Sequence, residues 1–149
     1  MKKSGITQNN LSSILIECFS ALLILLFVYT ATSKLLAHNS FAFTLSQSPL
    51  LHQYSLLLSW IIPFTEILIS FFLFIPSLRK TGLLFSALLM TAFTMYISYI
   101  IAFTSRLPCS CGGVIKSLTW SDHLILNMSF VVIAVSGWLM IKKNKILLQ

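Results

Sequence analysis

Two cysteines separated by one residue are the most chemically reactive pair of side chains in this sequence. Cys109 and Cys111 lie in the segment Pro108-Cys109-Ser110-Cys111-Gly112-Gly113. A disulfide across a single intervening residue closes a small, strained ring, and strained disulfides have more oxidising potentials than relaxed ones. A pair of this kind is suited to exchanging electrons with other thiols.

The neighbours of the pair fit this chemistry but leave other interpretations open. Gly112 and Gly113 allow a sharp backbone turn, and the cationic Arg106 and Lys116 favour a thiolate. The cysteines could instead be inert, either as reduced thiols or as a static disulfide. They could also bind a soft metal ion with His123 as a third ligand, although no second cysteine pair supports such a site.

A second set of polar residues follows the cysteines. Trp120, His123 and Asn127 recur at spacings of three and four, which places them on one face of a helix that begins just after the cysteine loop. His123 could exchange a proton during thiol chemistry, because imidazole titrates near neutral pH. Alternatively, the set is an interfacial tryptophan with two polar residues that bond neighbouring helices.

The elements that hold these residues are apolar and long. Charged residues make up 9% of the 149 residues and the mean hydropathy is +0.92, whereas soluble domains are about one quarter charged. The apolar runs cover residues 14–36, 55–75, 82–103 and 123–141, flanked by a leader, 1–13, and a basic tail, 142–149. Each run is about 20 residues, enough to cross a bilayer. The sequence therefore predicts an all-α membrane protein, a bundle of four transmembrane helices in one domain.

The distribution of charge predicts the orientation. The net charge is +7, but the basic residues cluster on one side of the predicted bundle rather than forming a nucleic-acid surface: Lys2, Lys3, Arg79, Lys80, Lys142, Lys143 and Lys145. The loops on the other side contain Lys34, Arg106 and Lys116. Basic loops stay in the cytoplasm, so both termini are predicted to be cytoplasmic and the cysteine loop extracytoplasmic. In a bacterium that side is oxidising.

One acidic residue lies deep in a predicted span. Glu66 is about 11 residues into the second run, roughly 16 Å below the outer surface at 1.5 Å per residue. A carboxyl group at this depth is costly and is expected to face the bundle interior. It could bond Tyr96, Thr91 or Thr94 on the third run. It could relay protons or contact a quinone head group, or it could be a structural polar contact beside Pro63.

Polar stripes predict which helix faces meet. The expected buried positions are Ser20, Thr30 and Lys34 in the first run, Ser59, Pro63, Glu66 and Ser70 in the second, and Thr91, Thr94, Ser98 and Ala102 in the third. Lys34 is expected to extend to the outer interface. Cys18, which lies near the inner surface, is expected to be a buried apolar residue. The aromatic loop 37–54 is expected to lie at the membrane interface as an ordered segment that could form a short helix.

Taken together, these residues resemble the DoxX/MauE superfamily of four-helix membrane proteins, and most closely its MauE branch. The similarity covers about residues 14 to 141. The matching features are Tyr29-x4-Lys34, the Phe41/Phe43 loop, Pro63-x2-Glu66, Arg79, Tyr96, Cys109-x-Cys111-Gly112-Gly113 and Leu118-x-Trp120-x2-His123-x3-Asn127.

The resemblance implies a bacterial inner-membrane protein associated with redox chemistry. The MauE branch is linked to methylamine utilisation, where it is thought to help mature a disulfide-rich dehydrogenase subunit beside a thioredoxin-like partner. The DoxX side includes quinone-linked oxidoreductase subunits. The arrangement is also analogous to membrane disulfide oxidases such as vitamin K epoxide reductase, which have a two-residue spacer and a second cysteine pair.

The leading hypothesis is a membrane thiol–disulfide redox protein, a candidate quinone-linked oxidoreductase. Cys109 and Cys111 would cycle between dithiol and disulfide with His123 nearby, and would act on a thioredoxin-like or other cysteine-bearing exported protein. Glu66, Tyr96, Trp120 and Asn127 are the candidate quinone-binding residues in the bundle interior. The alternatives are a non-catalytic assembly factor or small subunit of a redox complex, and a transporter of a small solute or metal ion.

Overall fold

The fold is a set of long helices joined by short connections. The computed structural model describes residues 4–48, 50–103 and 120–147. The helices are α1 (Ser4–Leu36), α2 (His38–Ser46), α3 (Ser55–Phe74), α4 (Arg79–Phe103) and α5 (Trp120–Leu147), with a 3-10 turn, η1 (His52–Tyr54), before α3. These described ranges contain no β-strand, which confirms the all-α prediction.

Four of the helices are long and apolar enough to cross a membrane. The membrane-length segments are Leu11–Leu36, His52–Phe74, Arg79–Phe103 and Asp122–Lys143. They agree with the four predicted spans to within a few residues at each end. The prediction of four transmembrane helices is therefore confirmed.

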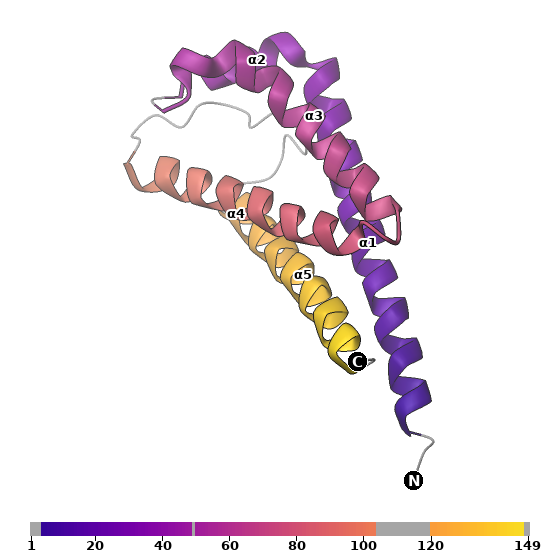
Figure 1. Ribbon diagram of the computed structural model, residues 1–149. Helices are drawn as coiled ribbons and strands as arrows, with labels where there is room; N and C mark the ends of the chain where they lie inside the picture. Colours follow the sequence, from indigo (N-terminus) through magenta and orange to yellow (C-terminus); the bar gives the residue numbers. More distant parts are fainter. Residues whose placement is uncertain (1–3, 49, 104–119, 148–149) are drawn as a thin grey trace.

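The four long helices form two antiparallel pairs. α1 packs mainly on α3, and α4 packs mainly on α5, while contacts of α3 with α4 and of α1 with α5 join the pairs into a ring. The two pairs lie close together at the end that contains the short turn between α3 and α4, and they diverge toward the end covered by α2 (Figure 1).

The tightly packed end contains the hydrophobic core. Its buried side chains come from all four long helices and include Leu23 and Phe27 of α1, Leu73 of α3, Leu83 of α4 and Ala134 of α5. These residues close the base of the space between the two helix pairs.

The N-terminal end of α1 and the C-terminal end of α5 both lie at the tightly packed end of the molecule (Figure 1). α1 already begins at Ser4 and α5 continues to Leu147, so helix extends into both the expected leader, 1–13, and the expected tail, 142–149. Once a helix is nucleated, each further residue adds one backbone hydrogen bond, and no proline interrupts either segment. Hydropathy marks the apolar part of a helix and not its ends.

The loop 37–54 contains the expected short helix. Phe41 and Leu45 of α2 are buried, and α2 packs on α3. His38 links the two helices: its Nε2 lies 3.0 Å from the Ser59 hydroxyl oxygen, and its ring lies 4.4 Å from that of Trp60. The expectation of an ordered segment with a short helix is confirmed, and its location at the membrane interface stays a prediction.

The polar stripe predicted for α3 is correct. Ser59, Pro63, Glu66 and Ser70 are all buried. Because α3 packs on both α1 and α4, small residues on this stripe allow close approach of the helices.

The stripe predicted for α4 is wrong. Thr91, Ser98 and Ala102 are exposed and Thr94 is only half-buried, whereas the buried face carries Gly82, Leu83, Ser86, Met90, Ile97 and Ile100. The hydroxyls of Thr91 and Thr94 donate to the carbonyls of Ala87 and Met90 at 2.7 and 2.8 Å. A threonine that bonds its own helix in this way needs no partner on another helix.

The prediction that Cys18 is buried is also wrong. Cys18 is exposed on α1. The outward face of a transmembrane helix meets lipid, which suits a small apolar thiol as well as a protein core does.

Close packing at the α3–α4 turn depends on Gly82. A Cβ atom at this position would lie 2.9 Å from the backbone nitrogen of Leu73, whereas one at Gly137 would meet side-chain atoms, those of Leu83 at 3.3 Å and of Phe19 at 3.6 Å. Backbone atoms cannot move aside as a flexible side chain can. The close approach of α3 and α4 therefore requires glycine at position 82.

We predict that Gly82→Ala lowers the free energy of unfolding by about 1–3 kcal/mol, as overpacking does. Gly137→Ala is the matched control and should be nearly neutral, because a better helix propensity of about 1 kcal/mol offsets a small shift of Leu83. Denaturant unfolding in detergent micelles measures both variants. Equal effects of the two substitutions would contradict the assigned approach of α3 and α4.

Candidate functional site

A buried ion pair lies between α1 and α3. Lys34 Nζ donates to Glu66 Oε1 at 2.5 Å, and the side chains are 12% and 1% exposed. Glu66 is on the buried stripe of α3, and Lys34 is in the last turn of α1. A lone charge at this depth would be costly, so each group compensates the other.

This pair replaces the contacts expected from the sequence. Thr91 and Thr94 bond their own helix, and Glu66 accepts from Lys34 instead. Lys34 was expected to extend to the membrane interface, but its long side chain turns inward to the carboxylate. The available signal was the presence of opposite charges in neighbouring spans; the difference in depth along the helices obscured it.

Two aromatic rings flank the lysine. Lys34 Nζ lies 5.9 Å from the ring centroid of Phe41 on α2 and 5.5 Å from that of Phe93 on α4. Cations are attracted to aromatic faces at these distances, and more strongly where water is excluded. The ammonium group of Lys34 therefore links α1, which carries it, to residues of α2, α3 and α4.

The other carboxylate oxygen has no hydrogen-bond partner among the described residues. Within the part of the chain that the structure describes, Glu66 Oε2 is buried without a hydrogen bond. The Thr30 hydroxyl, one turn before Lys34, also faces the carboxyl group, but it donates to the Phe27 carbonyl at 3.2 Å. An unsatisfied buried oxygen is costly, and in a cavity it can accept a bond from a ligand.

Glu66 and Lys34 line a cavity of about 310 Å³ between the two helix pairs. This volume is at the small end of the roughly 300–1,000 Å³ range of small-molecule sites. The lining is largely apolar, with side chains such as Leu58, Ile62 and Ile97. The polar lining residues are Thr30, Lys34, Thr44, Glu66, Tyr96, His123 and Asn127.

The cavity brings together four residues that the sequence analysis selected. Glu66 comes from α3, Tyr96 from α4, and His123 and Asn127 from α5. They are separated by up to about 60 positions in the chain, so the bundle and not a local motif unites them. Trp120 is the first residue of α5, but its side chain lies outside the described residues.

Cys109 and Cys111 also lie outside the described residues. The chain places them between the end of α4 at Phe103 and the start of α5 at Trp120. They therefore belong to the connection that enters α5 one turn before His123.

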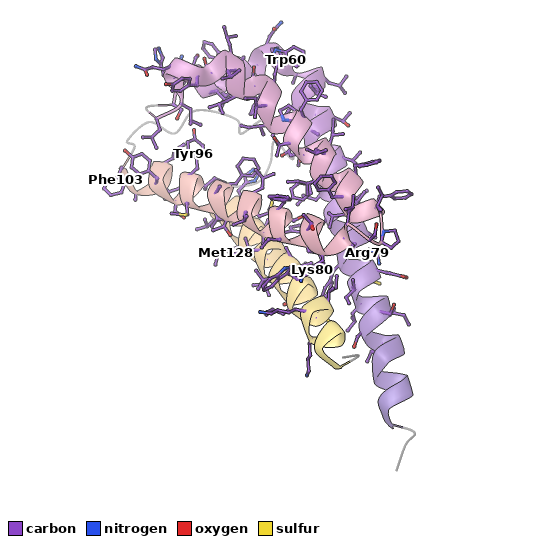
Figure 2. The ribbon with its side chains drawn as sticks, in the orientation of Figure 1. Trp60, Arg79, Lys80, Tyr96, Phe103 and Met128 are labelled. Carbon is purple, nitrogen blue, oxygen red and sulfur yellow. The ribbon has the colours of Figure 1, made fainter. Side chains whose placement is uncertain are left out.

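Tyr96 connects the cavity to the segment that follows α2. Its hydroxyl donates to the Ser48 hydroxyl oxygen at 2.8 Å, and Ser48 is buried. Figure 2 shows Tyr96 pointing from α4 into the space between the helix pairs. Together with Phe41 and Leu45, this bond fixes α2 and its connection over one end of the cavity.

A metal centre is not indicated by the described residues. They contain no group of three His, Cys, Asp or Glu side chains that could hold a metal ion. The alternative ligand set considered from the sequence, Cys109, Cys111 and His123, is largely outside the described ranges. It stays untested.

We predict strong energetic coupling between Lys34 and Glu66. Lys34→Met and Glu66→Met should each lower the free energy of unfolding by about 3–5 kcal/mol, because each leaves a buried charge without its partner. The double variant should lose far less than the sum. A double-mutant cycle by denaturant unfolding in detergent measures this coupling.

Arg79→Met is the control for removal of a charge. Arg79 Nη1 lies 3.9 Å from Glu17 Oε1, and Glu17 is exposed, so this variant should lose less than about 1 kcal/mol. Additive losses for Lys34 and Glu66 would contradict a buried pair.

Comparison with known proteins gives one result. A family model, described as methylamine utilisation protein MauE, matches residues 12–140. No curated protein and no solved structure matches the chain. The match covers the four membrane-length helices except for Leu11 at one end and residues 141–143 at the other, and it includes every described residue that lines the cavity. The chain is thus a multi-pass membrane protein that belongs to the MauE family.

Proposed function

We propose that this protein is a membrane thiol–disulfide redox protein that uses Cys109 and Cys111 to oxidise cysteines of exported proteins. The observation that carries the proposal is the intramembrane cavity, which gathers Glu66, Tyr96, His123 and Asn127 at the helix that follows the cysteine loop. Membership of the MauE family, which is linked to methylamine utilisation, supports a role in maturing a disulfide-containing protein of that system.

The exchange reaction is balanced between the client and the pair. A client thiolate attacks one sulfur of a Cys109–Cys111 disulfide, so that a mixed disulfide forms and the other cysteine leaves as a thiolate. A second client thiolate then attacks the mixed disulfide and releases the first cysteine. The client gains one disulfide and gives up two electrons. These two electrons reduce the Cys109–Cys111 disulfide to a dithiol.

Renewed turnover requires an acceptor of two electrons and two protons from this dithiol. The residues of the cavity fit a quinone: the walls are apolar, Lys34 can donate, and Glu66 Oε2 is a buried acceptor that no described residue satisfies. When bound, a quinone supplies that acceptor chemistry. Glu66, Tyr96 and Asn127 would hold it, as would Trp120 if its side chain reaches the cavity.

Residues of the chain would transfer protons, exclude water and hold Glu66 in position. His123, in the first turn of α5, would take protons from the dithiol as its electrons leave. The apolar walls would exclude water from the cavity, and Lys34 would keep Glu66 in place.

The proposal includes an orientation in a bacterial inner membrane. Arg79, Lys80, Lys142 and Lys143 lie at the end of the bundle opposite α2 (Figures 1 and 2). Because basic residues are retained in the cytoplasm, this end would be cytoplasmic, and α2 and the cysteine loop would face the periplasm. The wider relation to quinone-linked DoxX proteins belongs to the same proposal.

The redox state of the pair in membranes tests the function. Thiols are trapped with a mass-tagged maleimide in a Cys18→Ser background, since Cys18 is exposed and would add a third label. We expect Cys109 and Cys111 to be oxidised at rest, reduced by added client dithiol, and oxidised again on addition of a quinone. Cys109→Ser should abolish oxidation of the client.

Cys18→Ser alone is the matched control and should keep full activity. If Cys109→Ser oxidised the client at the rate of this control, the redox function would be wrong. If the double Cys109→Ser/Cys111→Ser variant still bound its partner and complemented a deletion strain, the protein would be a non-catalytic assembly factor.

A further inference from the structure

The polar groups of the cavity fall into two sets on different helix pairs. Lys34 and Glu66 belong to the α1–α3 pair, whereas His123 and Asn127 belong to α5 in the other pair. Thr30, Thr44 and Tyr96 also line the cavity, and the rest of the described lining is aliphatic and aromatic. A molecule that fills this space would therefore meet hydrogen-bonding groups from both helix pairs and apolar side chains over most of its surface.

The charges select a neutral occupant. Lys34 and Glu66 form an ion pair, so their net charge is zero, and among the residues that the structure describes His123 is the only other titratable acidic or basic side chain that lines the cavity. A carboxylate or phosphate head group would enter an apolar space without a free counter-ion, which is unfavourable. Fatty acids and phospholipids are thus poor candidates.

The ion pair can recognise both a carbonyl and a hydroxyl group. The ammonium of Lys34 has three N–H donors, of which one is used by Glu66 Oε1, so it can donate to a ligand carbonyl. Glu66 Oε2 is a buried acceptor and can accept a hydrogen bond from a ligand hydroxyl group. The Lys34–Glu66 pair can therefore bond the carbonyl oxygen of an oxidised ring as well as the hydroxyl group of its reduced form.

We propose that the cavity binds a flat, neutral ring with an oxygen at each end, of the quinone–quinol class. One oxygen lies at the Lys34–Glu66 pair and the other at His123 and Asn127. This inference rests on the proposed function and deepens it, because it assigns the two ends of the ligand to named residues. It predicts a preference for rings with two oxygens over rings with one.

The test measures binding of two probes to the full-length protein in lipid nanodiscs. The probes are a decyl-tailed benzoquinone and a decyl-tailed phenol, which has a single oxygen, each in competition with a photoreactive azidoquinone. The wild-type chain should bind the benzoquinone at least about tenfold more tightly, as expected for one additional buried hydrogen bond. Cross-links should map to cavity residues.

Asn127→Leu removes the amide with little change in size and should reduce this preference by about tenfold, mainly by weakening the benzoquinone. Thr65→Val is the matched control, because Thr65 neighbours Glu66 but bonds the Ile61 carbonyl and does not line the cavity. It should bind both probes as wild type does. The ratio of affinities is taken on one sample, so partial misfolding does not change it.

Two results would overturn the inference: equal affinity for the two probes, or competition by decanoate as strong as that by the benzoquinone. The Cys109→Ser/Cys111→Ser variant separates this inference from the proposed function. It should bind the benzoquinone as wild type does while failing to oxidise the client. Loss of the two-oxygen preference would reject the binding site even if the cysteines are redox-active.

Discussion

The structure depends on one interaction, the ion pair of Lys34 and Glu66. In lipid, apolar helix faces gain little by choosing one neighbour over another, so specific polar contacts decide how helices align. A charge on α1 and a charge on α3 cannot be separated without leaving one of them buried alone. Phe41 and Phe93 add α2 and α4 to the same contact. The pair thereby fixes the helices that surround the cavity.

The cavity is located where packing within each helix pair is complete but packing between the pairs is not. Toward the turn between α3 and α4, small residues such as Gly82 and Ala134 let the pairs close on a core. Toward α2 the pairs diverge (Figure 1), and side chains of both pairs line the cavity. The same bundle is therefore tightly packed at one end and contains a cavity at the other.

The sequence predicted the features that depend on hydropathy and helical spacing. The four spans and the α3 stripe were correct because burial in lipid or protein imposes an apolar character on whole segments. The contact of Lys34 with Glu66 was missed because it depends on the reach of a side chain between helices. Thr91 was misassigned because a threonine hydroxyl can bond a carbonyl of its own helix. Cys18 was misassigned because a small apolar side chain is as compatible with lipid as with a protein core.

The neutrality of the ion pair has a consequence for the response to membrane voltage. While Lys34 and Glu66 are both charged, the pair carries no net charge, and a transmembrane potential exerts no net force on it. A proton taken up by Glu66 leaves the lysine charge uncompensated at the same depth. Moving one charge across the full potential is worth about 2.3 kcal/mol per 100 mV, so part of that energy would bias protonation at this site. Any proton exchange at Glu66 would therefore depend on the membrane potential.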